Sequence, residues 1–155
     1  MVRQCSVKCE LHIFGADSGS YAAYLRNLAH ELNLSEKLTW HGFVSDRAQI
    51  YNKIDIGVVP SRFEEPFGLV AVEAAIAGLP CIATRKGGLP EIVQHQITGL
   101  LVGSNDPQNL AEALAKLVED PELRRRMGAA AQQVAREKFS RERLVSGFAD
   151  LVERC

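Results

Sequence analysis

Short apolar runs alternate along the chain with segments in which apolar residues recur every three or four positions. A short apolar run that ends in glycine, proline or another turn residue is typical of a β-strand. We therefore predict strands at 10–14, 38–42, 54–59, 80–84 and 100–102. The run at 54–59 is almost continuously apolar, as expected of a strand that is buried on both faces of a parallel sheet.

The segments between these strands have the apolar spacing of helices. We predict helices at 21–32, 46–53, 68–77 and 90–94. From residue 106 onward the sequence predicts three further helices, with Asp106, Asp120 and Ser140 as their N-caps. Strands that alternate with helices predict an α/β domain of three layers (αβα) with a parallel sheet, followed here by several C-terminal helices.

The composition is that of an ordinary soluble globular protein, with 46% hydrophobic and 24% charged residues. The net charge of −1 gives no field that attracts nucleic acid, so we predict no nucleic-acid partner. No run of about eighteen apolar residues and no signal-peptide pattern occurs, which predicts a soluble, cytoplasmic protein. Cys5, Cys9, Cys81 and Cys155 lack the spacing of a metal site, and we expect free thiols, with Cys81 in the core.

Basic residues gather in the C-terminal part, at Arg124–Arg126 and again between Arg136 and Arg143. They alternate with glutamates, which favours a solvated helical surface. A surface for phospholipid head groups is the alternative, so peripheral membrane association of a longer enzyme stays open.

Ligands of parallel α/β sheets bind beyond the carboxyl ends of the strands. Two of the loops that leave these ends are chemically unusual. The loop at 61–68 carries two carboxylates, Glu64 and Glu65, and the loop at 85–90 carries the pair Gly87 and Gly88. The glycine pair alone is a weak signal, because a Gly-Gly turn after a strand is more often only a turn.

Glu73 is the single charged residue in an otherwise apolar helix that follows the first of these loops. A buried carboxylate needs a partner or a polar cavity, because burying it alone costs several kcal/mol. A structural pair with an arginine or with backbone amides is one interpretation. Ligand binding is the other: the free amides of Phe67, Gly68 and Leu69 at the helix N-terminus, between the carboxylates of Glu65 and Glu73, suit a polyhydroxylated ligand with a phosphate.

A series of short motifs accompanies Glu65 and Glu73, which are separated by seven residues. The motifs are Pro60-Ser61, Pro66-Phe67-Gly68-Leu69, Glu73-Ala74, Gly87-Gly88-Leu89-Pro90-Glu91 and Thr98-Gly99-Leu100-Leu101-Val102. In this order and at these distances they resemble the group 1 glycosyltransferases, family 4 of the sequence-based classification. The resemblance runs from about residue 9 to the C-terminus.

The resemblance implies the GT-B architecture, in which the active site lies between two Rossmann-like domains, and it identifies this chain with the C-terminal, donor-binding domain. It implies a retaining transfer of a hexosyl unit from a UDP-, GDP- or ADP-hexose to an acceptor hydroxyl, with no metal and no cofactor. The sequence has no Asp-x-Asp pair, the usual metal–diphosphate motif of the other major glycosyltransferase fold.

By position, the resemblance gives Glu65 the catalytic role of orienting the donor sugar and stabilising the positive charge that develops on it. The amides of Phe67, Gly68 and Leu69 would bind the same sugar. Glu73 would bind the ribose hydroxyls.

The resemblance places two further contacts with the nucleotide. Gly87 and Gly88 would lie near the diphosphate. The backbone at Phe43 and Val44 would border the base, although packing is the favoured interpretation of the Phe43 ring.

The chain departs from the family in length, since complete members need more than twice its 155 residues. We therefore expect one incomplete domain over 1–155, without the N-terminal acceptor domain, that is inactive alone. Self-association through the apolar face of the last helix, 140–154, stays open. A non-catalytic, glycosyltransferase-like binding or scaffold module is the alternative function.

Overall fold

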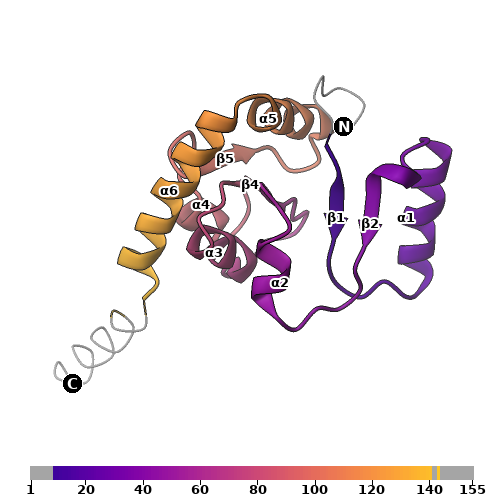
Figure 1. The fold of residues 1–155 in the computed structure, drawn as a ribbon, viewed down its shortest axis with the longest axis horizontal. Helices are drawn as coiled ribbons and strands as arrows, with labels where there is room; N and C mark the ends of the chain where they lie inside the picture. Colours follow the sequence, from indigo (N-terminus) through magenta and orange to yellow (C-terminus); the bar gives the residue numbers. More distant parts are fainter. Residues whose placement is uncertain (1–8, 141–142, 144–155) are drawn as a thin grey trace.

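The structure, a computed structural model, describes residues 9–140 and residue 143. Strands and helices alternate as the sequence predicts (Figure 1). The strands are β1 (Leu11–Ile13), β2 (Leu38–Trp40), β3 (Gly57–Val59), β4 (Cys81–Thr84) and β5 (Gly99–Val102). The helices are α1 (Ser20–Glu31), the short 3₁₀ helix η2 (Ser35–Lys37), α2 (Arg47–Tyr51), α3 (Leu69–Ile76), α4 (Leu89–Ile92), α5 (Pro107–Glu119) and α6 (Pro121–Lys138).

All strand pairs in the described residues are parallel, which confirms the predicted sheet type. The pairs form two ladders rather than one continuous sheet: β1 pairs with β2, and β4 lies between β3 and β5. β3 is shorter than the predicted strand at 54–59, because the chain turns after α2 and enters the ladder at Gly57, opposite Cys81. In Figure 1 the β1–β2 ladder lies with α1 on one side of the molecule, and the second ladder lies among α3, α4, α5 and α6.

Side chains of β4 point alternately to the two faces of its ladder, as the period of a strand requires. Cys81 and Ala83 lie in a buried cluster with residues of α3 and α4, whereas Ile82 lies in a second cluster with residues of α5 and α6. Helices therefore cover both faces, and the three-layer αβα arrangement is confirmed. Cys81 is a core residue as predicted, and its burial raises the pKa of its thiol to about 12.

α6 packs against α3 through small residues. Ala75 of α3 forms a buried cluster with Ala131 and Ala135 of α6. One turn earlier in α6, a Cβ added at Gly128 would lie 2.1 Å from the carbonyl oxygen of Gly78, just beyond the end of α3. Glycine at position 128 thus allows the helix to approach the backbone at the end of α3 closely.

The predicted caps of the C-terminal helices are present. The carboxylate of Asp106 accepts a hydrogen bond from the Asn109 amide at 2.9 Å, and that of Asp120 accepts one from the Leu123 amide at 2.9 Å. Ser140 Oγ accepts a hydrogen bond from the Arg143 amide at 3.3 Å. The remainder of the predicted third helix lies outside the described residues.

Candidate functional site

Two loops meet at the carboxyl ends of the neighbouring strands β3 and β4. The Gly88 amide, after β4, donates a hydrogen bond to the Glu65 carbonyl, after β3, at 2.8 Å. The Thr84 hydroxyl at the end of β4 donates to the Ser61 carbonyl, also at 2.8 Å. The structure thus brings together the two loops that the sequence singled out.

Glycines allow the close approach of the two loops. A Cβ at Gly87, which has a φ of +50°, would lie 2.1 Å from the Glu65 carbonyl oxygen. A Cβ at Gly68, which has a φ of +89°, would lie 2.7 Å from a methyl carbon of Leu89. Both positions have a left-handed backbone that favours glycine. At Gly87 the neighbour is backbone, so a larger residue there would separate the loops, whereas at Gly68 it would displace the Leu89 side chain.

The N-terminus of α3 follows directly after the first of these loops. Gly68 is its N-cap and makes no side-chain cap, and within the described residues no acceptor engages the amides of Phe67, Gly68 or Leu69. The side chains of Phe67 and Leu69 are about half exposed. Gly68 itself is buried, whereas Phe67 and Leu69 are exposed. The amides at the positive end of this helix dipole thus lack an acceptor within the described residues, as the sequence predicted.

Glu65 lies at this helix end and is partly buried. The Ser61 hydroxyl donates a hydrogen bond to one oxygen of its carboxylate at 3.3 Å. The preceding residue, Glu64, is exposed and binds the second loop: its carboxylate accepts hydrogen bonds from Lys86 Nζ at 3.1 Å and from the Gly87 amide at 2.6 Å. These two hydrogen bonds, the larger effect coming from Lys86, lower the pKa of the Glu64 carboxyl below its ordinary value.

The amides of Gly87 and Gly88 are therefore engaged by the first loop in this structure, the former by the Glu64 carboxylate and the latter by the Glu65 carbonyl. Their contact with a diphosphate stays a prediction. Lys86 is an additional cation beside them that the motif analysis did not single out.

Glu73 has two partners from α2. Its side chain is 17% exposed, and one carboxylate oxygen is bound by Arg47 Nε while the other accepts a hydrogen bond from the Tyr51 hydroxyl at 2.9 Å. The expectation that this carboxylate needs a partner is confirmed, and the partner is an arginine. Burial and the neighbouring Glu73 raise the pKa of Tyr51, so its hydroxyl stays protonated as a donor.

Sequence reasoning missed Arg47 and Tyr51. The available signal was their spacing of four on a short helix that starts at a capping aspartate, Asp46, whose carboxylate accepts a hydrogen bond from the Ala48 amide at 2.9 Å. Residues four apart lie on the same face of a helix, so the two side chains reach one carboxylate together.

Val44 lies in the segment between β2 and α2, two residues before Asp46, and is partly buried. The neighbouring Phe43 is 84% exposed. The favoured packing interpretation of the Phe43 ring is therefore wrong, and the ring is accessible to a ligand. Trp40, by contrast, is covered by Arg26, whose guanidinium carbon lies 4.5 Å from the ring centroid.

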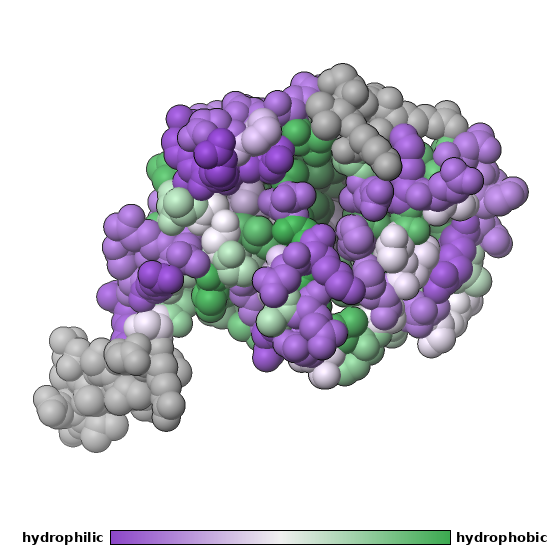
Figure 2. Space-filling model, in the orientation of Figure 1, coloured by the Kyte–Doolittle hydropathy of each residue, from purple (hydrophilic) through white to green (hydrophobic). Residues whose placement is uncertain are grey.

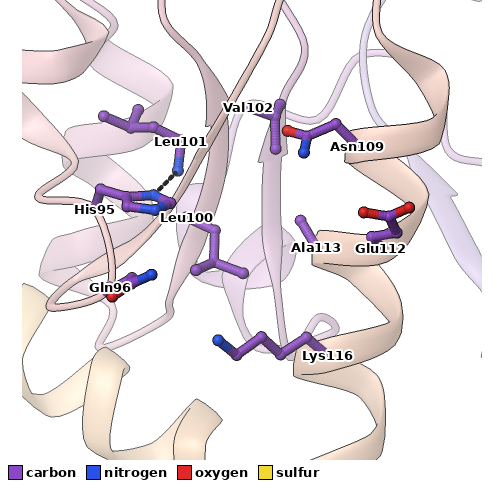
Figure 3. Close-up of a pocket in the computed structure, with 9 residues that line it drawn as sticks. All are labelled: His95, Gln96, Leu100, Leu101, Val102, Asn109, Glu112, Ala113 and Lys116. Carbon is purple, nitrogen blue, oxygen red and sulfur yellow. Dashed lines mark hydrogen bonds between the residues drawn. The ribbon is translucent and has the colours of Figure 1, made fainter.

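A separate pocket of about 180 Å³ lies between β5, α5 and the segment at 95–96 (Figure 3). His95 faces it, and its Nδ1 accepts a hydrogen bond from the Leu101 amide at 3.0 Å. Desolvation, followed by the charges of Arg85 and Lys116, lowers the pKa of His95. The pocket is lined by none of the predicted site residues, so we place the candidate site at the two loops instead.

The described residues contain no group of three or more His, Cys, Asp or Glu side chains that could hold a metal ion. None of the helices in this part of the chain is both long and apolar enough to cross a membrane. The two loops and α3 offer groups that can bind a polar ligand. These are the carboxylate acceptors of Glu65 and Glu73, the amide donors at the start of α3 and the cation of Lys86.

Comparison with known proteins gives a consistent result. The family model of the glycosyl transferases of group 1 matches residues 2–134. The N-acetyl-alpha-D-glucosaminyl L-malate synthase of Bacillus anthracis is 36% identical over 121 residues, which cover 78% of this chain and 32% of that protein. The D-inositol 3-phosphate glycosyltransferase of Corynebacterium glutamicum is 43% identical over 128 residues, which cover 80% of this chain and 30% of that protein.

Among solved structures, the Anabaena protein Alr3699/HepE in complex with UDP and glucose superposes with a TM-score of 0.92 at 26% identity, over 99% of this chain and 43% of that chain. The chain spans about a third of the length of the two curated relatives. The superposition confirms the Rossmann-like fold, and the family match confirms the resemblance to group 1 glycosyltransferases that was based on the sequence motifs. The chain belongs to the glycosyl transferases of group 1.

Proposed function

We propose that the chain is the donor-binding part of a retaining, metal-independent glycosyltransferase that transfers a hexosyl unit from a nucleotide sugar to an acceptor hydroxyl. The observation that carries this proposal is the start of α3, where the amides of Phe67, Gly68 and Leu69 have no acceptor within the described residues. In the sequence they stand between Glu65 and Glu73, whose side chains are both partly buried. Support comes from the Anabaena relative, which binds UDP and glucose on the same fold.

In this proposal Glu65 and the first amides of α3 bind the hexose. Glu65 accepts hydrogen bonds from sugar hydroxyls with its carboxylate oriented by Ser61. As the bond to the leaving phosphate weakens, positive charge develops on the sugar, and the nearby carboxylate stabilises it. The leaving phosphate takes the proton of the acceptor hydroxyl on the same face, which retains the anomeric configuration.

The nucleotide follows the surface from α3 toward α2. Glu73 binds the ribose, Gly87 and Gly88 border the diphosphate, and the backbone at Val44 borders the base. For the Gly87 amide to bind a phosphate, the carboxylate of Glu64 must first leave it, and the Gly88 amide must likewise give up the Glu65 carbonyl. Lys86 is then a fixed cation for the same charge.

The proposal of metal independence is supported by the hydrogen-bond donors and the cation that the chain supplies for the phosphate charge. Backbone amides at a helix N-terminus and a lysine side chain together offset phosphate charge without a metal ion. The acceptor and its binding surface belong to a longer protein, because the chain matches only 30–32% of the length of the curated relatives. We expect the isolated chain to bind a donor without transferring its sugar.

A direct test is calorimetric titration of the chain with UDP, GDP and ADP, and then with the matching hexose conjugates, in excess EDTA. We expect saturable binding of one nucleotide, weakened at least tenfold by Glu73→Ala and unchanged by Glu112→Ala, which alters a carboxylate in the separate pocket. Binding that appears only after a divalent metal is added would contradict metal independence.

A non-catalytic binding or scaffold module is the second candidate. It is favoured by the ion pair between Arg47 and Glu73, which satisfies the carboxylate without any ligand. The titration separates donor binding from a scaffold, because a scaffold gives no saturable nucleotide binding while the chain remains folded. A binding module without catalysis is separated by assaying sugar transfer in a longer protein that contains this chain.

A further inference from the structure

Tyr51 connects two parts of the candidate site that are distant in sequence. It ends α2, the helix that follows the segment with Phe43 and Val44, and its hydroxyl lies 2.9 Å from a carboxylate oxygen of Glu73 on α3. The hydroxyl is also 3.4 Å from the Val70 carbonyl. A phenol has one proton to donate, and the shorter distance assigns it to Glu73.

The two contacts from α2 leave part of the Glu73 carboxylate unused. A carboxylate has about four acceptor positions, two on each oxygen. Arg47 occupies a position on one oxygen, and Tyr51 occupies a position on the other. One position per oxygen remains, and 17% of the side chain is open to solvent. This arrangement matches a vicinal diol, which donates one hydrogen bond to each oxygen.

We propose that Tyr51 is a positioning residue for the ribose of the nucleotide donor, because its hydroxyl fixes the Glu73 carboxylate with both remaining acceptor positions facing the ribose diol. The inference rests on the proposed function of Glu73. Tyr51 does not touch the ligand in this arrangement and acts through the carboxylate.

The contact between Tyr51 and Glu73 can orient the carboxylate in addition to packing α2 against α3. The tyrosine ring is half-buried, so a phenylalanine fills the same space and removes the donor alone. Arg47 is largely exposed, with 66% of its side chain accessible, and it balances the charge of the carboxylate through one oxygen. Without Tyr51 the carboxylate is held on one oxygen and turns more freely about its last bond.

The test compares Tyr51→Phe with the unaltered chain on two probes. The first is whichever of UDP, GDP and ADP binds, and the second is its 2′,3′-dideoxy form, which keeps the base and diphosphate. We expect Tyr51→Phe to raise the Kd of the ribonucleotide about tenfold, or about 1.4 kcal/mol, and to change the Kd of the dideoxynucleotide less than twofold. Tyr24→Phe, at an exposed tyrosine on α1, is the matched control and should change neither.

Equal weakening of binding for both probes would contradict the inference, because it indicates a general loosening of the α2–α3 contact. Unchanged binding of both probes would contradict it as well. In both cases the proposed function survives, because the unaltered chain still binds the ribonucleotide. If the unaltered folded chain binds none of the three nucleotides, the proposed function fails, and the role of Tyr51 fails with it.

Discussion

The two parallel ladders differ in how well they are buried. Around β3, β4 and β5, helices cover both faces, and almost every buried apolar residue of the described chain lies at or after Ala71. Around β1 and β2, the buried apolar residues are two alanines of α1, Ala22 and Ala29. Large apolar side chains there remain exposed, including those of Tyr21 and Tyr24.

Hydrophobic side chains also reach the surface of the molecule. In the space-filling view, hydrophobic side chains are visible in the hollowed middle of the face, beside α5, whereas the outer surface of α5 is hydrophilic (Figure 2). The sugar and diphosphate contacts proposed above lie on the well-buried part, at the ends of β3 and β4. The base contact at Val44 lies on the thinly buried part. The loops after β3 and β4, which would orient the reacting sugar, are thus supported by the better buried of the two ladders.

The largest expected difference between the two regions is in amide hydrogen exchange. Amides of the central strand β4 open only when the core around Ile82 and Leu117 opens, whereas β1 is covered far less completely. We expect protection factors in β4 to exceed those in β1 by about 100-fold or more, as measured by exchange with mass spectrometry or NMR. Equal protection in both strands would contradict the difference in burial.

A matched pair of leucine truncations should give the next largest effect. Leu117 of α5 is completely buried, and Leu11 of β1 is 37% exposed. Leu117→Ala should lower the free energy of unfolding by about 3 kcal/mol, and Leu11→Ala by less than about 1 kcal/mol. Chemical denaturation followed by circular dichroism measures both. Comparable losses would show that the first ladder has a core as tight as the second.

The smallest effect concerns the histidines of the first ladder. His41 follows β2, and its Nε2 lies 2.9 Å from Nδ1 of His12 in β1. Desolvation, then the charges of Lys53 and His12, lower the pKa of His41 below its ordinary value of 6.5. The folded form therefore binds fewer protons than the unfolded chain just below pH 6.5, and stability is lost as the pH falls through that range.

The corresponding measurement is urea unfolding at pH 7.5, 6.5 and 5.5. We expect the free energy of unfolding of His41→Gln to fall less between pH 6.5 and pH 5.5 than that of the unaltered chain. Part of the fall should remain because of His95, whose pKa is also lowered. A slope that does not respond to His41→Gln would place the pH dependence elsewhere.

Local chemistry made most of the fold predictable. Glycine and proline mark the strand ends, and the aspartates at 46, 106 and 120 mark helix starts that the structure reproduces. The division of the strands into two ladders was not predictable, because strand pairing depends on contacts between residues far apart in sequence. The start of β3 was misjudged for a related reason: an apolar run does not show which of its residues find a partner strand.

The candidate site was predictable to the same degree. An isolated carboxylate in an apolar helix indicates that Glu73 has a partner. The glycine pair at 87–88 indicated only a turn or a ligand contact, and the close approach of the two loops there is a finding of the structure. The identity of the partners was not predictable, because Arg47 and Tyr51 reach Glu73 from a helix more than twenty residues away. Likewise the bond between Glu64 and Gly87 depends on how two loops meet.

The most direct test of donor binding at the two loops is to map the amides that respond when UDP-glucose, GDP-mannose or ADP-glucose is added to the ¹⁵N-labelled chain without metal. We predict that one of these donors shifts the amides of Phe67, Gly68 and Leu69 at the start of α3, together with those around Val44. Shifts confined to the pocket at His95 and Lys116, or no shifts from a folded chain, would contradict the proposed site.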